Sequence, residues 1–163
     1  MTIEAASGRR AGTSAWVRMV TVAVAVVALD QLTKVVVRGA MGRGEQIDVL
    51  LGFQIVNVRN TGIAFGLLAN GGTLLVIVTA VTLCVLLGWF ATQPVRPGLW
   101  IAIGVLVGGA LGNLLDRLRH GEVTDFLDPP LWPAFNVADI AITVGVVGLI
   151  AIAFRGDRHA AEP

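Results

Sequence analysis

The run WVRMVTVAVAVVALDQLTKVVV, residues 16–37, is long and apolar enough to cross a membrane as a helix. A helix rises about 1.5 Å per residue, so roughly 20 apolar residues span the hydrocarbon core. Three further runs meet the same criterion, at residues 72–91, 98–118 and 137–154. The sequence therefore predicts a mainly α integral membrane protein with four transmembrane helices, forming a single domain over residues 1–163.

The two ends of the chain differ from these runs. Residues 1–14 and 156–163 are polar or small, and we expect them to be disordered tails. Basic residues precede the first run, as they do in a secretory signal. However, apolar character resumes after Asp30 and Lys34 without a clear cleavage site, so we expect this run to remain as a helix.

The composition excludes several kinds of function. Hydrophobic residues make up 55% of the chain and charged residues 14%, whereas soluble domains carry about 25% charged residues. The net charge of +1 is too small to hold a polyanion, which excludes nucleic acid as a partner. Serine occurs only as Ser7 and Ser14, and Cys84, His120 and His159 stand apart from one another. We therefore expect no serine or cysteine nucleophile, no metal site and no cofactor.

The distribution of basic residues predicts the orientation in the membrane. On the side of the two ends lie Arg9, Arg10, Arg18, Arg96, Arg155 and Arg158. On the other side lie Arg38, Arg43, Arg59, Arg117 and Arg119, in longer loops. Because the first group is denser, the positive-inside rule places both termini in the cytoplasm. The outer loops, residues 38–71 and 119–136, then contain most of the polar chemistry.

The first outer loop is predicted to contain a small β-rich region. Residues 46–50 and 53–58 are β-favouring stretches separated by two residues, which is typical of a hairpin. Asn60-Thr61-Gly62 predicts a turn after them. Residues 63–69 are short and apolar, and we expect them to lie in the membrane interface.

Charged residues at the edges of the apolar runs gather on the outer side. They are Asp30, Lys34, Asp116, Arg117 and Asp139, with Asp125 in the loop between the third and fourth runs. A charge at the bilayer centre costs roughly 2.5–3.5 kcal/mol on insertion scales. A polar cluster at one membrane depth, contributed by three helices and a loop, therefore indicates a functional site.

Several of these residues also have a purely structural interpretation. Asp30 and Lys34 are spaced i,i+4 and can neutralise each other on one helix face. Asn136 followed by Asp139 is typical of a helix N-cap with an acidic partner three residues later. Taken alone, Asp125 could be an ordinary loop carboxylate.

The third run contains a glycine ridge that predicts close helix packing. Gly104, Gly108 and Gly112 recur every four residues, which lets a neighbouring helix approach closely. Asp116 follows one turn later. We expect Asp116 and Arg117 to support the end of this helix.

Five blocks of sequence resemble, in order and spacing, the lipoprotein signal peptidases, also called type II signal peptidases. The blocks are DQLTK at 30–34, NTGIAFG at 60–66, GGALGNLLDR at 108–117, VTDF at 123–126 and FNVAD at 135–139. The resemblance implies a membrane aspartic protease of four helices. Such an enzyme removes the signal peptide from diacylglyceryl-modified prolipoproteins and cuts before the lipid-bearing cysteine.

The resemblance also implies roles for individual residues. Asp125 and Asp139 match the catalytic pair of the family. The residues implied to bind substrate or support the site are Asp30, Lys34, Asn60, Gly62, Asn113, Asp116, Arg117 and Asn136. The implied partners are lipid-modified prolipoproteins and membrane lipids. The expected form is a monomer in the bacterial inner membrane, with its active site near the outer face.

Two neighbouring carboxylates can hydrolyse an amide bond without a metal ion or a nucleophilic side chain. They cannot both ionise comfortably, so they share a proton and their pKa values split. One takes a proton from water while the other gives one to the carbonyl oxygen. We expect Asp139 to be the more readily ionised member, because the dipole at a helix start stabilises negative charge.

Two other classes of function are compatible with four apolar helices. A proton or cation carrier would use the same carboxylates, but its polar path should continue through the membrane. Here Thr79 and Thr82 are the main polar interruptions of the second run, which disfavours transport. A purely structural subunit would need the glycine ridge but would leave the clustered aspartates unexplained.

Overall fold

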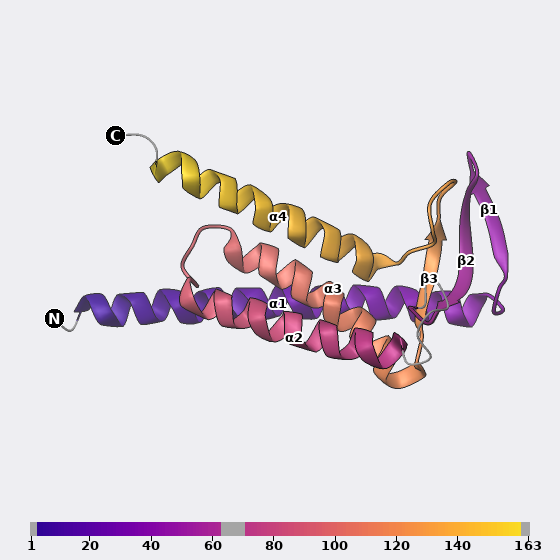
Figure 1. Cartoon of the computed structure of the whole chain (residues 1–163), viewed down its shortest axis with the longest axis horizontal. Coiled ribbons are helices and arrows are strands. Elements are labelled where there is room, and N and C mark those ends of the chain that lie inside the picture. Colours follow the sequence, from indigo (N-terminus) through magenta and orange to yellow (C-terminus); the bar gives the residue numbers. More distant parts are fainter. Residues whose placement is uncertain (1–2, 63–70, 161–163) are drawn as a thin grey trace.

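The structure is a computed structural model that describes residues 3–62 and 71–160. This part of the chain forms a helical bundle with a small sheet at one end (Figure 1). The helices are α1 (Ile3–Ala40), α2 (Gly71–Thr92), α3 (Leu99–His120) and α4 (Val137–Ala160). The strands are β1 (Gln46–Leu50), β2 (Phe53–Asn60) and β3 (Val123–Asp128). The start of α1 and the end of α4 both lie at the end of the bundle opposite the sheet.

Each helix contains a stretch long and apolar enough to cross a membrane. The stretches are Ala11–Ala40, Thr73–Thr92, Leu99–His120 and Val137–Arg155. Much of their apolar surface faces outward, as expected when the solvent is lipid: Val81 of α2 is 57% exposed and Val147 of α4 is 60% exposed. The four predicted membrane helices are therefore confirmed.

Helices α1 and α4 extend into the two terminal segments for which disorder is expected. Helix α1 begins at Ile3, although disorder is expected for residues 1–14, and α4 continues to Ala160 instead of ending near residue 154. Neither segment contains proline. Once a long helix is nucleated, each added residue gains a hydrogen bond, so a helix can extend beyond its apolar part.

The sheet is antiparallel with the strand order β1-β2-β3. The predicted hairpin is confirmed as β1 and β2, whose turn places Leu51 and Gly52 at positive φ values of 54° and 79°. Strand β3 comes from the second outer loop and pairs with β2, which the sequence analysis does not predict. The predicted interfacial segment at residues 63–69 lies outside the described residues.

Glycines allow α3 to pack closely against two helices. A Cβ added at Gly104 would lie 2.8 Å from the backbone oxygen of Met19 in α1, and one at Gly108 would lie 2.8 Å from that of Ala23. On the other side, a Cβ at Gly109 would lie 2.5 Å from the backbone oxygen of Ala138 in α4. Real Cβ contacts are not this short, so the predicted ridge is a packing surface that needs glycine.

Replacement of Gly108 by alanine is expected to destabilise the bundle. The new methyl group would contact the α1 backbone and Val26, and overpacking typically costs about 1–3 kcal/mol. Gly88→Ala in α2 is the matched control, because a Cβ there meets nothing within 4 Å. Thermal unfolding in detergent should show a lower Tm for Gly108→Ala only. Equal Tm values for the two variants would disprove the close approach.

Candidate active site

Asp125 and Asp139 come from different elements, and Asn136 joins them. Asp125 lies in the middle of β3, and Asp139 lies in the first turn of α4. Asn136 Nδ2 donates a hydrogen bond to Asp125 Oδ1 at 2.7 Å, and Asn136 N donates to Asp139 Oδ2 at 3.1 Å. A single fully buried residue therefore contacts both carboxyl groups.

The position of Asp139 depends on the start of α4. Asp139 N donates to Asn136 Oδ1 at 3.1 Å, while Asn136 N donates back to the Asp139 carboxylate. This reciprocal pair is a capping box, as the spacing of the two residues predicts. Asp139 thus has a structural role as well as a place at the site, because its carboxylate satisfies a backbone N–H that the helix leaves without a partner.

Asn60 holds the second oxygen of Asp125. Asn60 Nδ2 donates to Asp125 Oδ2 at 3.0 Å, and Asn60 Oδ1 accepts from Gly62 N at 2.7 Å. Gly62 has a φ of 77°, and an added Cβ would overlap Leu75 Cδ1. Glycine at position 62 therefore allows the turn that orients the Asn60 amide toward Asp125.

Burial raises the pKa of the Asp125 carboxyl above its ordinary value. The side chain is almost fully enclosed, which penalises the charged form, and the negative charge of Asp139 acts in the same direction. Hydrogen bonds from Asn60 and Asn136 oppose this change. Asp125 therefore keeps its proton to a higher pH than an exposed aspartic acid does.

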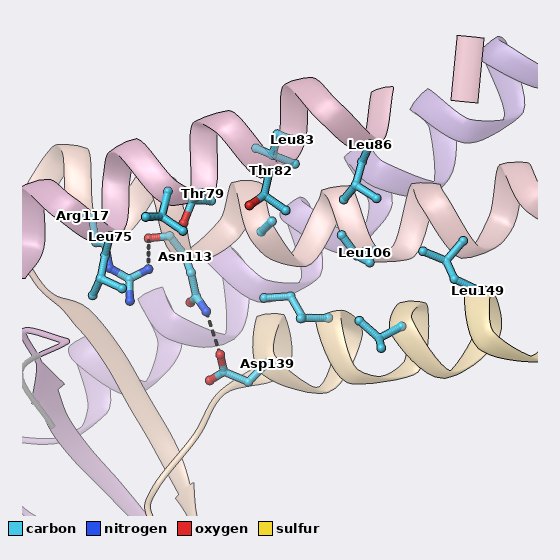
Figure 2. A pocket seen from close by; sticks show the side chains of 14 residues that line it. Leu75, Thr79, Thr82, Leu83, Leu86, Leu106, Asn113, Arg117, Asp139 and Leu149 are labelled. Carbon is cyan, nitrogen blue, oxygen red and sulfur yellow. Dashed lines mark hydrogen bonds between the residues drawn. The ribbon is translucent and has the colours of Figure 1, made fainter. Parts of the chain in front are cut away.

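Asn113 of α3 connects Asp139 to the interior of the bundle. Its Nδ2 donates to Asp139 Oδ1 at 2.8 Å (Figure 2). Its Oδ1 accepts from Lys34 Nζ at 2.9 Å and from Asn136 Nδ2 at 3.2 Å. Two donors on the oxygen settle the orientation of the amide, so the nitrogen faces Asp139.

Lys34 is fully buried between two carboxylates. Its Nζ lies 2.9 Å from Asp30 Oδ2 and 3.0 Å from Asp116 Oδ2, and both carboxylates are also fully buried. Asp30 Oδ1 accepts from Ala138 N at 3.0 Å, which ties α1 to the first turn of α4. The predicted i,i+4 pair is confirmed, and Asp116 is a third member that spacing alone does not indicate.

Arg117 lies at the edge of a cavity beside Asp139. The cavity of about 480 Å³ lies between α2, α3 and α4, and Figure 2 shows Asn113, Arg117 and Asp139 at one end of it and Leu86, Leu106 and Leu149 toward the other. The buried Arg117 Nε has no hydrogen-bond partner among the described residues.

The structure brings the predicted site residues to one end of the bundle, and it adds residues that the sequence analysis missed. Gln31 Nε2 donates to Asp116 Oδ1 at 3.2 Å and to Gly112 O at 3.1 Å. Arg38 Nη1 lies 3.6 Å from Asp116 Oδ1. Both residues are one turn or less from Asp30 or Lys34 on α1, and this proximity is the signal that could have identified them. Among the described residues, no group of three or more His, Cys, Asp and Glu side chains is arranged to hold a metal ion.

The fold and the site define a class of multi-pass membrane proteins. In this class, two carboxyl groups that are joined through one asparagine lie at one end of a helical bundle. The family model described as signal peptidase (SPase) II matches residues 22–155. The chain therefore belongs to the signal peptidase II family, which makes it a peptidase and confirms the resemblance.

Individual relatives agree with this assignment. A lipoprotein signal peptidase of Pelotomaculum thermopropionicum is 46% identical over 81% of this chain and 88% of its own length. One from Syntrophotalea carbinolica is 44% identical over 88% and 95%. A bacterial membrane enzyme structure, solved by the in meso method at 1.9 Å resolution, has a TM-score of 0.76 at 35% identity and covers 82% of this chain and 90% of that one.

Proposed function

We propose that this protein is an aspartic endopeptidase that removes the signal peptide from diacylglyceryl-modified prolipoproteins and cuts before the lipid-bearing cysteine. The observation that carries the proposal is the contact of Asn136 with both Asp125 and Asp139, the second of which lines an apolar cavity. The names of the relatives support the substrate class.

In the proposed mechanism, the two carboxyl groups have different tasks. Asp139 lies in the first turn of α4 and acts as the general base that takes a proton from water. Asp125, whose pKa is raised by burial, gives a proton to the carbonyl oxygen of the scissile bond. The water oxygen adds to the carbonyl carbon, and Asp139 then gives its proton to the leaving nitrogen as the C–N bond breaks, so no covalent enzyme intermediate forms.

The proposed site lies at the outer face of the bacterial inner membrane. Asp125 and the sheet lie at the end of the bundle opposite the start of α1 and the end of α4, which the positive-inside rule assigns to the cytoplasm (Figure 1). A diacylglyceryl group anchored in the outer leaflet would hold a scissile bond at this depth. The apolar cavity between α2, α3 and α4 offers a place for an apolar part of the substrate.

A comparison of two substrates tests this proposal. We expect the purified protein, in lipid vesicles, to cleave a prolipoprotein peptide with a diacylglyceryl-cysteine and to leave the same peptide without the lipid largely uncut. Mass spectrometry should locate the new N-terminus at the modified cysteine. Equal cleavage of both peptides would contradict the substrate assignment, and cleavage of neither would contradict the proposed activity.

A further inference from the structure

Thr124, the residue immediately before Asp125, is fully buried and contacts three charged side chains. Its Oγ1 accepts a hydrogen bond from Arg38 Nη1 of α1 at 3.1 Å and another from Arg59 Nη1 of β2. Its backbone N–H donates to Asp116 Oδ2 at 3.4 Å. A hydroxyl oxygen has two lone pairs, so both are occupied by guanidinium N–H groups.

Strand geometry links this contact to the catalytic face. Consecutive residues of a strand point to opposite faces, so Thr124 faces the two arginines while Asp125 faces Asn60 and Asn136. Arg59 is the residue directly opposite Thr124 in the β2–β3 register. The hydrogen bonds of Thr124 therefore fix β3 from the side opposite to Asp125.

We propose that Thr124 is a positioning residue of this enzyme. Its hydroxyl, held between Arg38 and Arg59, sets the place of the Asp125 carboxyl relative to Asn136 and thus to Asp139. The proposal rests on the proposed function of Asp125 as a catalytic carboxyl. It assigns Arg38 and Arg59 to the same task, since both donate hydrogen bonds to Thr124.

Other hydrogen-bond acceptors lie near the two arginines and are available to them when the hydroxyl is absent. Arg38 Nη1 lies 3.6 Å from Asp116 Oδ1, and Arg59 Nε lies 3.8 Å from Glu122 Oε1. Without the hydroxyl, both guanidinium groups would move toward these carboxylates and β3 would lose its hydrogen bond with Arg38 of α1. A misplacement of about 1 Å at a reacting group can cost roughly 10²-fold in rate.

Two substitutions at position 124 test the proposal. Thr124→Val keeps the shape and removes the hydroxyl, and Thr124→Ser keeps the hydroxyl and removes the methyl group. We expect Thr124→Val to lower kcat for the diacylglyceryl peptide by roughly 10–100-fold with little change in KM, because the substrate still binds. Thr124→Ser should restore most of the lost kcat. Thr21→Val is the control, since that hydroxyl donates to Val17 O within α1 and is exposed.

Several outcomes would overturn the proposal. Wild-type kcat in Thr124→Val would do so, as would equal losses in the valine and serine variants, which would indicate packing. A change confined to KM would also contradict it. If Thr124→Val does not fold, Arg38→Gln replaces it, with a lowered kcat expected and an unchanged kcat contradicting the proposal.

A second measurement separates this proposal from the proposed function. If the wild-type protein cleaves no substrate, the function fails, and carbon-13 titration of the Asp125 carboxyl then tests the role of Thr124. Loss of the hydroxyl should weaken the hydrogen bonds from Asn60 and Asn136, which oppose the raised pKa, so the titration midpoint should move to higher pH. The midpoint should be unchanged in Thr21→Val. An unchanged midpoint in Thr124→Val would overturn the proposal.

Discussion

Asp125→Asn and Asp139→Asn are each expected to lower kcat for a diacylglyceryl peptide by roughly 10²–10⁴-fold, the contribution of a positioned acid or base. Asparagine is nearly the same size as aspartate but neither takes a proton from water nor gives one to a carbonyl. Both variants should insert into the membrane and remain folded. The measurement is the steady-state cleavage rate in vesicles at saturating substrate, which reports kcat.

The local hydrogen bonds also give both variants a stability cost that a control does not share. Asp125 accepts amide N–H groups on both oxygens, from Asn60 and Asn136, so the amide nitrogen of asparagine there must face a donor. Asp139 likewise accepts N–H groups on both oxygens, from Asn113 and Asn136. We therefore expect each variant to lose about 1–3 kcal/mol of stability. Asp128→Asn, at the end of the same strand, should keep wild-type cleavage. Normal cleavage by either dyad variant would exclude the proposed mechanism.

Lys34→Met is expected to have the largest effect on stability. Methionine keeps much of the length of the side chain, but the substitution leaves Asp30 and Asp116 buried without the cation that lies within 3.0 Å of each. Breaking a buried ion pair typically costs about 3–5 kcal/mol. For a chain of this size, that loss corresponds to a Tm lower by roughly 6–20 °C in a detergent unfolding scan.

The chain offers two controls for Lys34→Met. Arg43→Met removes the exposed partner of Glu122, and because the arginine side chain is 69% exposed we expect a loss of at most about 1 kcal/mol. The double variant Lys34→Met with Asp116→Asn should recover part of the lost Tm, since it leaves one fewer buried charge. Equal Tm values for Lys34→Met and Arg43→Met would show that the buried cluster does not stabilise the fold.

Much of the site could be predicted because several of its contacts join residues that are close together in the sequence. The i,i+4 pair Asp30 and Lys34 and the capping box of Asn136 and Asp139 each lie within one helical turn, so their contacts follow from helix geometry. The roles of Asp125 and Asp139 as a catalytic pair came from the resemblance and stay a prediction.

Contacts between distant segments could not be predicted in this way. Thr124 meets Arg38 across 86 residues and Arg59 across 65 residues of sequence. Strand β3 is six residues long and contains two aspartates, so nothing in its own composition distinguishes it from a loop. It becomes a strand because β2 offers an unpaired edge beside it.

The amino-acid sequence alone determines the four membrane helices, the hairpin and the close approach of α3. These features depend on the length of each apolar run, on the spacing of β-favouring residues and on glycines that lack a side chain, all of which are local properties of the sequence. The tertiary structure alone decides that Asp116 joins Asp30 and Lys34, that Asn113 and Asn136 join Asp139 to Asp125, and that Thr124 lies between two arginines. These contacts depend on the rotation of each helix about its axis and on strand register. Both are set by the packing of the whole bundle, which no single stretch of sequence specifies.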